Sequence, residues 1–97
     1  MSKIYVSGQI TGIPLETAKR TFVEAAQTLT RQGWEVVNPF DNGLPVEAPY
    51  EEHLAADLQL LLGCKALFSL RGWQQSNGAR IEVAFAKRLG IKVIHEE

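Results

Sequence analysis

The sequence lacks most of the features that mark specialised classes of protein. Cys64 is its only cysteine, so the chain has no internal disulfide, and the apolar surroundings LQLLLGCKALFSL predict a buried, reduced thiol. His53 and His95 lie far apart without metal-site spacing, so we predict no metal and no cofactor. No apolar run approaches the roughly 20 residues of a membrane span, and MSKIYVSG lacks a signal-peptide core. We therefore expect a cytoplasmic protein without a membrane partner.

An excess of charge of one sign is also absent. Ten Lys and Arg residues are interspersed with 11 Asp and Glu residues, which gives a net charge of -1. Without a basic block, a nucleic-acid polymer is not an expected partner. The composition of 45% hydrophobic and 22% charged residues is typical of a folded domain, and 97 residues suit one domain with one core.

The chain alternates between strand patterns and helix patterns. Strands are expected at 3–7, 34–37, 66–70 and 91–95, where short β-rich runs occur. Helices are expected from residue 15 to a stop at Gly33, at about 50–62, and at 78–89. This alternation predicts a small three-layer α/β sandwich with a four-stranded, mostly parallel, Rossmann-like (flavodoxin-like) sheet and a central first strand.

The expected fold also predicts where a ligand binds. Parallel α/β sheets bind ligands at the carboxyl ends of their strands, near the point where the strand order reverses. That rule selects residues 5–12, 38–41 and 70–78.

Two carboxylates stand where helix periodicity calls for apolar side chains. Asp57 shares a stripe with Leu54 and Leu61, and Leu62 is also expected to point inward. Glu82 shares a stripe with Ala86 and Leu89. Taken singly, Asp57 fits the boundary of an amphipathic helix, and Glu82 fits an acid stabilised by the helix dipole. Two inward carboxylates beside the predicted cleft favour function instead, because paired carboxylates suit glycosidic-bond chemistry.

Two short turns rich in glycine and hydroxyl groups join a strand to a helix. They are SGQITG at 7–12 and SNGA at 76–79, and backbone N–H groups at such helix starts bind anions. Neither turn has a Walker or dinucleotide fingerprint, so ordinary turns remain the alternative. Trp73, close to the second turn, suits either stacking on a ligand base or covering the sheet edge.

Taken in order along the chain, these pieces resemble one known family. The opening KIYVSGQITG, an aspartate in the second predicted helix and the stretch GWQQSNGARIEVAFA resemble the nucleoside 2-deoxyribosyltransferase superfamily over nearly the whole chain. Within it, the resemblance is strongest to short, largely uncharacterised domains of phage and bacterial genomes. It implies one domain of this type over residues 1–97, with a nucleoside or a nucleoside 5′-monophosphate as its ligand.

The resemblance also implies roles for individual residues. Glu82 matches the glutamate that attacks the anomeric carbon, Asp57 the aspartate that serves the base or acts as general acid, and Tyr5 the tyrosine that orients the glutamate. The implied substrate-binding residues are Ser7, Gly8, Ile10, Gly12, Trp73, Ser76, Asn77 and Gly78. The implied activity is that of an N-glycosidase or 2-deoxyribosyltransferase.

Two positions bear on the choice of substrate. Six residues before the glutamate, the transferases carry an aspartate, whereas the branch that hydrolyses deoxynucleoside 5′-monophosphates carries a serine, as this chain does at Ser76. The resemblance there favours a 5′-phosphate. The phosphate branch places an arginine in the first loop, where this chain has Thr11, which points to weak phosphate affinity.

Two other functions stay open at the level of sequence. One is a nucleotide-binding module without turnover, and the other is a small interaction protein whose carboxylates lie on its surface. We further expect a homodimer or larger homo-oligomer, because Trp34, Phe40 and the leucine-rich second helix offer more apolar surface than so short a domain buries easily.

Overall fold

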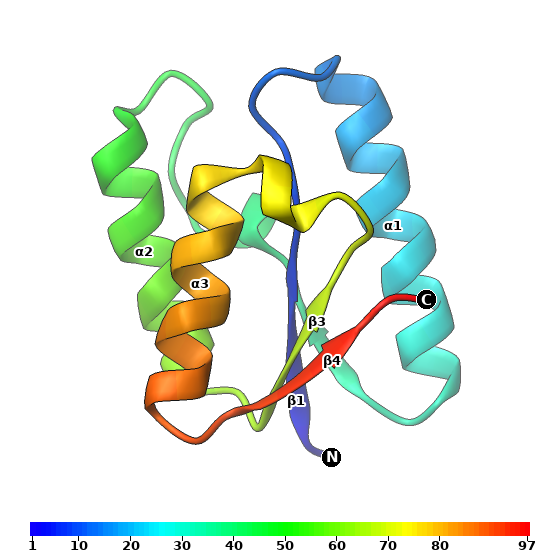
Figure 1. Cartoon of the computed structure of the whole chain (residues 1–97). Coiled ribbons are helices and arrows are strands. Elements are labelled where there is room, and N and C mark those ends of the chain that lie inside the picture. Colours follow the sequence, from blue (N-terminus) through cyan, green and yellow to red (C-terminus); the bar gives the residue numbers. More distant parts are fainter.

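The boundaries of the strands and helices follow the sequence pattern closely in the computed structural model, which describes residues 1–97 (Figure 1). The elements, in chain order, are β1 (Lys3–Ser7), α1 (Leu15–Arg31), β2 (Glu35–Val37), the 3₁₀ turn η1 (Pro39–Asp41), α2 (Tyr50–Leu62), β3 (Ala66–Ser69), the 3₁₀ turn η2 (Trp73–Gln75), α3 (Asn77–Arg88) and β4 (Lys92–His95). None of the three α-helices has the length and apolar character needed to cross a membrane.

The four strands form one sheet in the order β2-β1-β3-β4, and every neighbouring pair is parallel. The predicted α/β sandwich with a Rossmann-like sheet is therefore confirmed. The first strand is one of the two interior strands, with Tyr5 in register between Val37 and Leu67. The strand order reverses beside β1, so a ligand site is expected above its carboxyl end.

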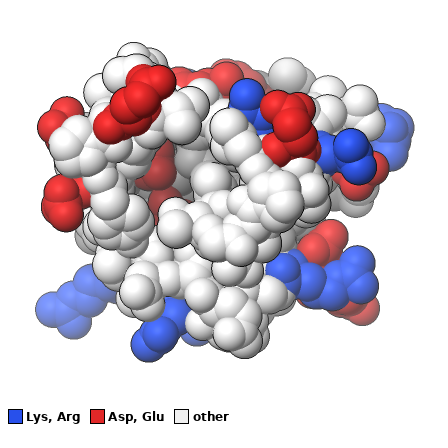
Figure 2. All heavy atoms as spheres, turned by 90° about the horizontal axis from the view of Figure 1, so that it is seen from above, with Lys and Arg blue, Asp and Glu red and all other residues white.

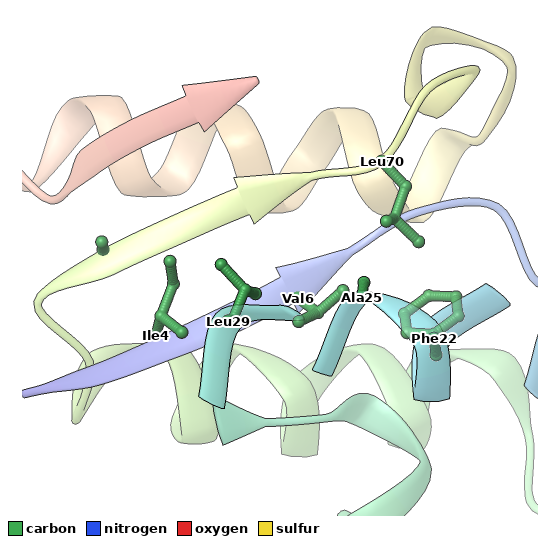
Figure 3. Packing of buried hydrophobic residues seen from close by; sticks show 7 residues of the cluster. Ile4, Val6, Phe22, Ala25, Leu29 and Leu70 are labelled. Carbon is green, nitrogen blue, oxygen red and sulfur yellow. The ribbon is translucent and has the colours of Figure 1, made fainter. Parts of the chain in front are cut away.

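One face of the sheet packs against α1. Side chains alternate along a strand, so Ile4 and Val6 of β1 point to the same side. There they meet Phe22 and Leu29 of α1 in a buried apolar cluster, shown in Figure 3. Phe40 of η1 packs edge-on against Phe22, with ring centroids 5.2 Å apart, and so ties the turn after β2 to this core.

The opposite face packs against α2 and α3. Tyr5 and Leu67 from the sheet contact Leu61 of α2 and Val83 of α3 in a second buried cluster. Because of the same alternation, Ser7 of β1 also faces this side and is fully buried. Tyr5 and Ser7 therefore point toward the helix that carries Glu82.

Two leucines that the sequence placed on inward helix faces lie at the surface. Leu62 is 52% exposed and Leu89 is 49% exposed. Leu62 follows the buried Leu61 and is rotated about 100° from it, and Leu89 lies one residue past the end of α3. The inward stripe on each helix is thus narrower than the sequence analysis predicted.

Candidate active site

Glu82 lies inside the protein and is held by two hydroxyl groups from β1. The Tyr5 hydroxyl donates to Oε2 at 2.9 Å, and the Ser7 hydroxyl donates to Oε1 at 2.7 Å. Glu82 itself is only 5% exposed. Two strand residues at i and i+2 thus hold both oxygens of one carboxyl, which fixes its orientation.

The electrostatics of Glu82 reflect two opposing effects. The pKa of Glu82 is raised from 4.5 to about 7 in total, because burial raises it most, the hydrogen bonds from Ser7 and Tyr5 lower it, and the nearby Asp57 raises it. Burial disfavours the charged form and hydrogen-bond donors favour it, so burial dominates here. Near neutral pH the group changes readily between acid and carboxylate.

Asp57 comes from α2 and lines the same cleft as Glu82. It is 9% exposed, and its Oδ1 accepts a hydrogen bond of 2.9 Å from the Asn42 side chain. Burial raises the pKa of Asp57, while the Asn42 hydrogen bond and the neighbouring His53 lower it. The cleft therefore holds two carboxyl groups whose pKa values are both raised, so each keeps its proton to a higher pH than an exposed carboxyl group does.

The cleft lies above the carboxyl end of β1 and has a volume of about 330 Å³. Figure 2 looks onto this end of the molecule, where a hollow carries acidic atoms in its depth. Its walls include Ile10, Phe40, Leu44 and Val46, and no lysine or arginine lines it. The site thus combines apolar walls with two carboxyl groups and has no lysine or arginine side chain.

Glycine allows the backbone to come close at one wall of the cleft. A Cβ on Gly8 would lie 2.7 Å from Leu70 Cδ1 and 3.0 Å from Leu70 Cβ, closer than atoms tolerate. Any side chain at this position would have to displace Leu70. Gly8 therefore lets the loop after β1 turn tightly over β3 and leaves the cleft open.

The cleft is also closed on the side of α3 by an aromatic ring. A Cβ on Gly78 would lie 3.1 Å from the Tyr50 hydroxyl, so this glycine lets Tyr50 of α2 pack against the start of α3. Burial, followed by the charges of Glu82 and Asp57, raises the pKa of Tyr50. Tyr50 therefore stays a neutral phenol beside the two carboxyl groups.

Six of the eleven residues that the sequence analysis assigned to the site line this cleft. They are Gly8, Ile10, Asp57, Ser76, Gly78 and Glu82. Tyr5 and Ser7 lie behind them and reach the cleft only through Glu82. Ser76 is the N-cap of α3, where its Oγ accepts a hydrogen bond of 3.2 Å from the Ala79 backbone N–H.

Three predicted substrate-binding residues lie outside this cleft. Trp73 stacks on His95 at 5.4 Å between ring centroids and so covers the end of β4. Asn77 belongs to a shallow groove on the outer side of α3. Gly12 turns the first loop with a φ of 92° and does not line the cleft.

Three further parts of the cleft wall were not predicted from the sequence, namely Asn42, His53 and the loop after η1. His53 stands four residues before Asp57 on α2, a spacing that places both on one helix face and was available as a signal. The loop after η1 has no hydrophobic periodicity, so its position beside the cleft could not be predicted from the sequence. Nowhere in the structure do three or more His, Cys, Asp or Glu side chains gather in a group that could hold a metal ion.

The chain resembles known proteins in sequence and in fold. A family model described as a domain of unknown function (DUF4406) matches residues 2–95. The fold is similar to that of a solved 2-desoxiribosyltransferase from Leishmania mexicana, with a TM-score of 0.75 and 15% identity, over 98% of this chain and 63% of that chain. The chain thus spans less than two thirds of that enzyme, and at this identity the similarity shows the fold. No curated protein sequence matches the chain.

Proposed function

We propose that this chain, which belongs to the DUF4406 family, cleaves the N-glycosidic bond of nucleosides, with Glu82 as nucleophile and Asp57 as general acid. The observation that carries the proposal is the buried Glu82 carboxyl, oriented by Tyr5 and Ser7 in a cleft that also holds Asp57. The fold of a 2-desoxiribosyltransferase supports it. In this proposal residues 1–97 form one domain of that type.

The chemistry divides into two steps. In the first, a Glu82 carboxylate oxygen forms a bond to the anomeric carbon while the bond to the base nitrogen breaks. The electron pair of that bond stays on the base, and the Asp57 carboxyl gives the base a proton. In the second step, water or the nitrogen of another base attacks the anomeric carbon and releases Glu82, and Asp57 takes a proton back.

Each of these roles requires a particular proton state of its carboxyl group. Burial raises the pKa of each, and the charge of Asp57 adds to the rise at Glu82. Over a range of pH, two interacting carboxyl groups hold one proton between them. In the productive arrangement this proton is on Asp57, and Glu82 is ionised. As positive charge develops on the sugar, it favours the ionised form of Glu82.

The lining of the cleft favours a neutral nucleoside over a 5′-monophosphate. A phosphate dianion needs cationic side chains or free N–H donors. No lysine or arginine lines this cleft, whereas two carboxyl groups line it. The Ser76 hydroxyl, which the resemblance links to phosphate, accepts the Ala79 N–H and has one uncharged O–H left to donate, which does not replace a cationic side chain. Apolar walls of the kind formed by Leu44 and Val46 suit the faces of a base.

The test is to incubate the protein with a panel of ribo- and deoxynucleosides and their 5′-monophosphates and to measure free base by chromatography. We expect base release from at least one nucleoside, a lower kcat/KM for its 5′-monophosphate, and no release by Glu82→Gln. Release that survives in Glu82→Gln would contradict the assignment of the nucleophile. Nucleoside binding without release would favour a binding module instead.

A further inference from the structure

One side of the cleft is fixed by hydrogen bonds that meet at Asn42. Its Oδ1 accepts from the Leu44 backbone N–H at 3.0 Å. Its Nδ2 lies 2.9 Å from Asp57 Oδ1 and 3.0 Å from His53 Nδ1. His53 Nε2 lies 3.0 Å from the Pro45 carbonyl oxygen. One amide thus joins the acid on α2 to the loop that follows η1.

The partners determine where each hydrogen in this network lies. The Leu44 N–H can only donate, so Asn42 must present its oxygen there and its NH₂ group to Asp57 and His53. The Pro45 carbonyl can only accept, so His53 carries its hydrogen on Nε2. Nδ1 of the neutral ring is then a bare acceptor, which matches the second amide hydrogen of Asn42. All the hydrogen bonds are satisfied by one arrangement.

This arrangement has a consequence for the acid. Asp57 Oδ1 receives the Asn42 N–H, so a proton on Oδ1 would face another hydrogen. The protein offers Oδ2 no hydrogen-bond partner, and Asp57 lines the cleft. A protonated Asp57 therefore carries its hydrogen on Oδ2, the oxygen left free to donate to a ligand.

The same network holds one wall of the cleft. Asn42 closes a tight turn onto Leu44, and His53 holds the carbonyl of Pro45. Leu44, Val46 and Ala48 of this loop line the cleft. The orientation of the acid and the position of the apolar wall thus depend on one amide side chain.

We propose that Asn42, held by His53, is a positioning residue for the glycosidic reaction, which confines the acid proton of Asp57 to Oδ2 and fixes the apolar wall beside it. This inference rests on the proposed function and adds a second requirement to it. The acid must be protonated, and the proton must also lie on the oxygen that the ligand can reach.

Asn42→Asp tests the proposal most sharply. The substitution is nearly isosteric and keeps an acceptor for the Leu44 N–H, but it replaces the NH₂ group by an oxygen that accepts. The proton of Asp57 then moves to Oδ1, between the two carboxyl groups and away from the base. Because a general acid contributes on the order of 10²–10⁴ in rate, we expect kcat on a nucleoside to fall by at least about 10²-fold.

A second substrate separates this effect from simple misfolding. A 4-nitrophenyl 2-deoxyriboside releases a stable phenolate that needs no proton, so Asn42→Asp should retain its kcat within about threefold. His53→Ala should show the same dependence on the leaving group with a smaller loss. Gln27→Glu makes the same amide-to-carboxylate change on the exposed face of α1 and should leave both rates unchanged. Equal losses on both substrates, or no loss on the nucleoside, would overturn the proposal.

An NMR titration of Asp57 tests the role of Asn42 without a measurement of turnover. The Asn42 hydrogen bond lowers the pKa of Asp57, so the carboxyl carbon of Asp57 should titrate at higher pH in Asn42→Ala than in the unaltered protein. An unmoved titration would contradict the proposal. If the protein released base from no nucleoside, the proposed function would fail, and the titration would still show whether Asn42 controls the proton of Asp57.

Discussion

Replacing Glu82 by glutamine should make the protein more stable above neutral pH while it removes the proposed nucleophile. Glutamine has nearly the same shape and no charge. Its carbonyl oxygen can accept from the Ser7 hydroxyl, and its NH₂ group can donate to the Tyr5 oxygen, so both contacts of Glu82 persist. The main change is that no carboxylate has to be buried.

The size of the effect follows from the raised pKa. Burial raises the pKa of Glu82 from 4.5 to about 7, so the folded protein keeps a proton there that the unfolded chain loses. The stabilisation is complete below about pH 4.5 and is lost as the pH rises to about 7, with a slope of about 1.4 kcal/mol per pH unit. Ionising Glu82 in the folded protein thus costs about 3 kcal/mol above pH 7. Such a difference shifts the Tm of a domain of this size by roughly 10 °C or more.

The assay is urea denaturation of both proteins from pH 4 to pH 8.5. The difference in unfolding free energy between Glu82→Gln and the unaltered protein should be near zero at pH 4 and should grow to about 3 kcal/mol by pH 8. Groups that titrate in both proteins and do not interact with Glu82 cancel from this difference. Glu24→Gln, at an exposed position in the middle of α1, should show no such growth. A difference that does not change with pH would refute the reasoning.

The remaining predictions concern the donors to Glu82, the packing of the first loop and the assembly. Both hydroxyl donors lower the pKa of Glu82, and Ser7 lowers it more than Tyr5 does. In an NMR titration of the Glu82 carboxyl, Ser7→Ala should therefore raise the pKa more than Tyr5→Phe does. The opposite order would contradict this prediction. Gly8→Ala should destabilise the fold by about 1–3 kcal/mol in urea denaturation because its Cβ meets Leu70, whereas Gly63→Ala, whose Cβ lies no closer than 3.6 Å to its neighbours, should be tolerated. We also expect a homodimer or larger assembly, since Leu62, Ile81 and Leu89 are 42–52% exposed, and sedimentation as a monomer at micromolar concentration would contradict this.

The fold could be predicted from the sequence because its signals are local. Each helix has an apolar stripe, and each strand is a short β-rich run. A glycine follows the end of α1, and another follows the end of α3. The inward positions of Asp57 and Glu82 followed from the same periodicity, since both stand in otherwise apolar stripes. The strand boundaries were predicted to within a residue at each end.

The parts that could not be predicted depend on contacts between distant segments. Trp73 stacks on His95 because β3 and β4 pair in a register that places Ser69 beside His95, which no local pattern specifies. The Asn42 side chain is held by a hydrogen bond to Asp57 of α2, which lies 15 residues further along the chain. An asparagine in the turn NPFDNG reads as an ordinary loop residue until its partners are known.

The most direct test of the central claim is to look for a sugar attached to Glu82. An Asp57→Ala variant incubated with 4-nitrophenyl 2-deoxyriboside should accumulate the intermediate, because the activated leaving group departs without an acid while the second step lacks its base. Mass spectrometry of the intact and digested protein should then show the mass of one deoxyribosyl group on the peptide that carries Glu82. Phenolate release without any such adduct, or an adduct on another residue, would contradict the account.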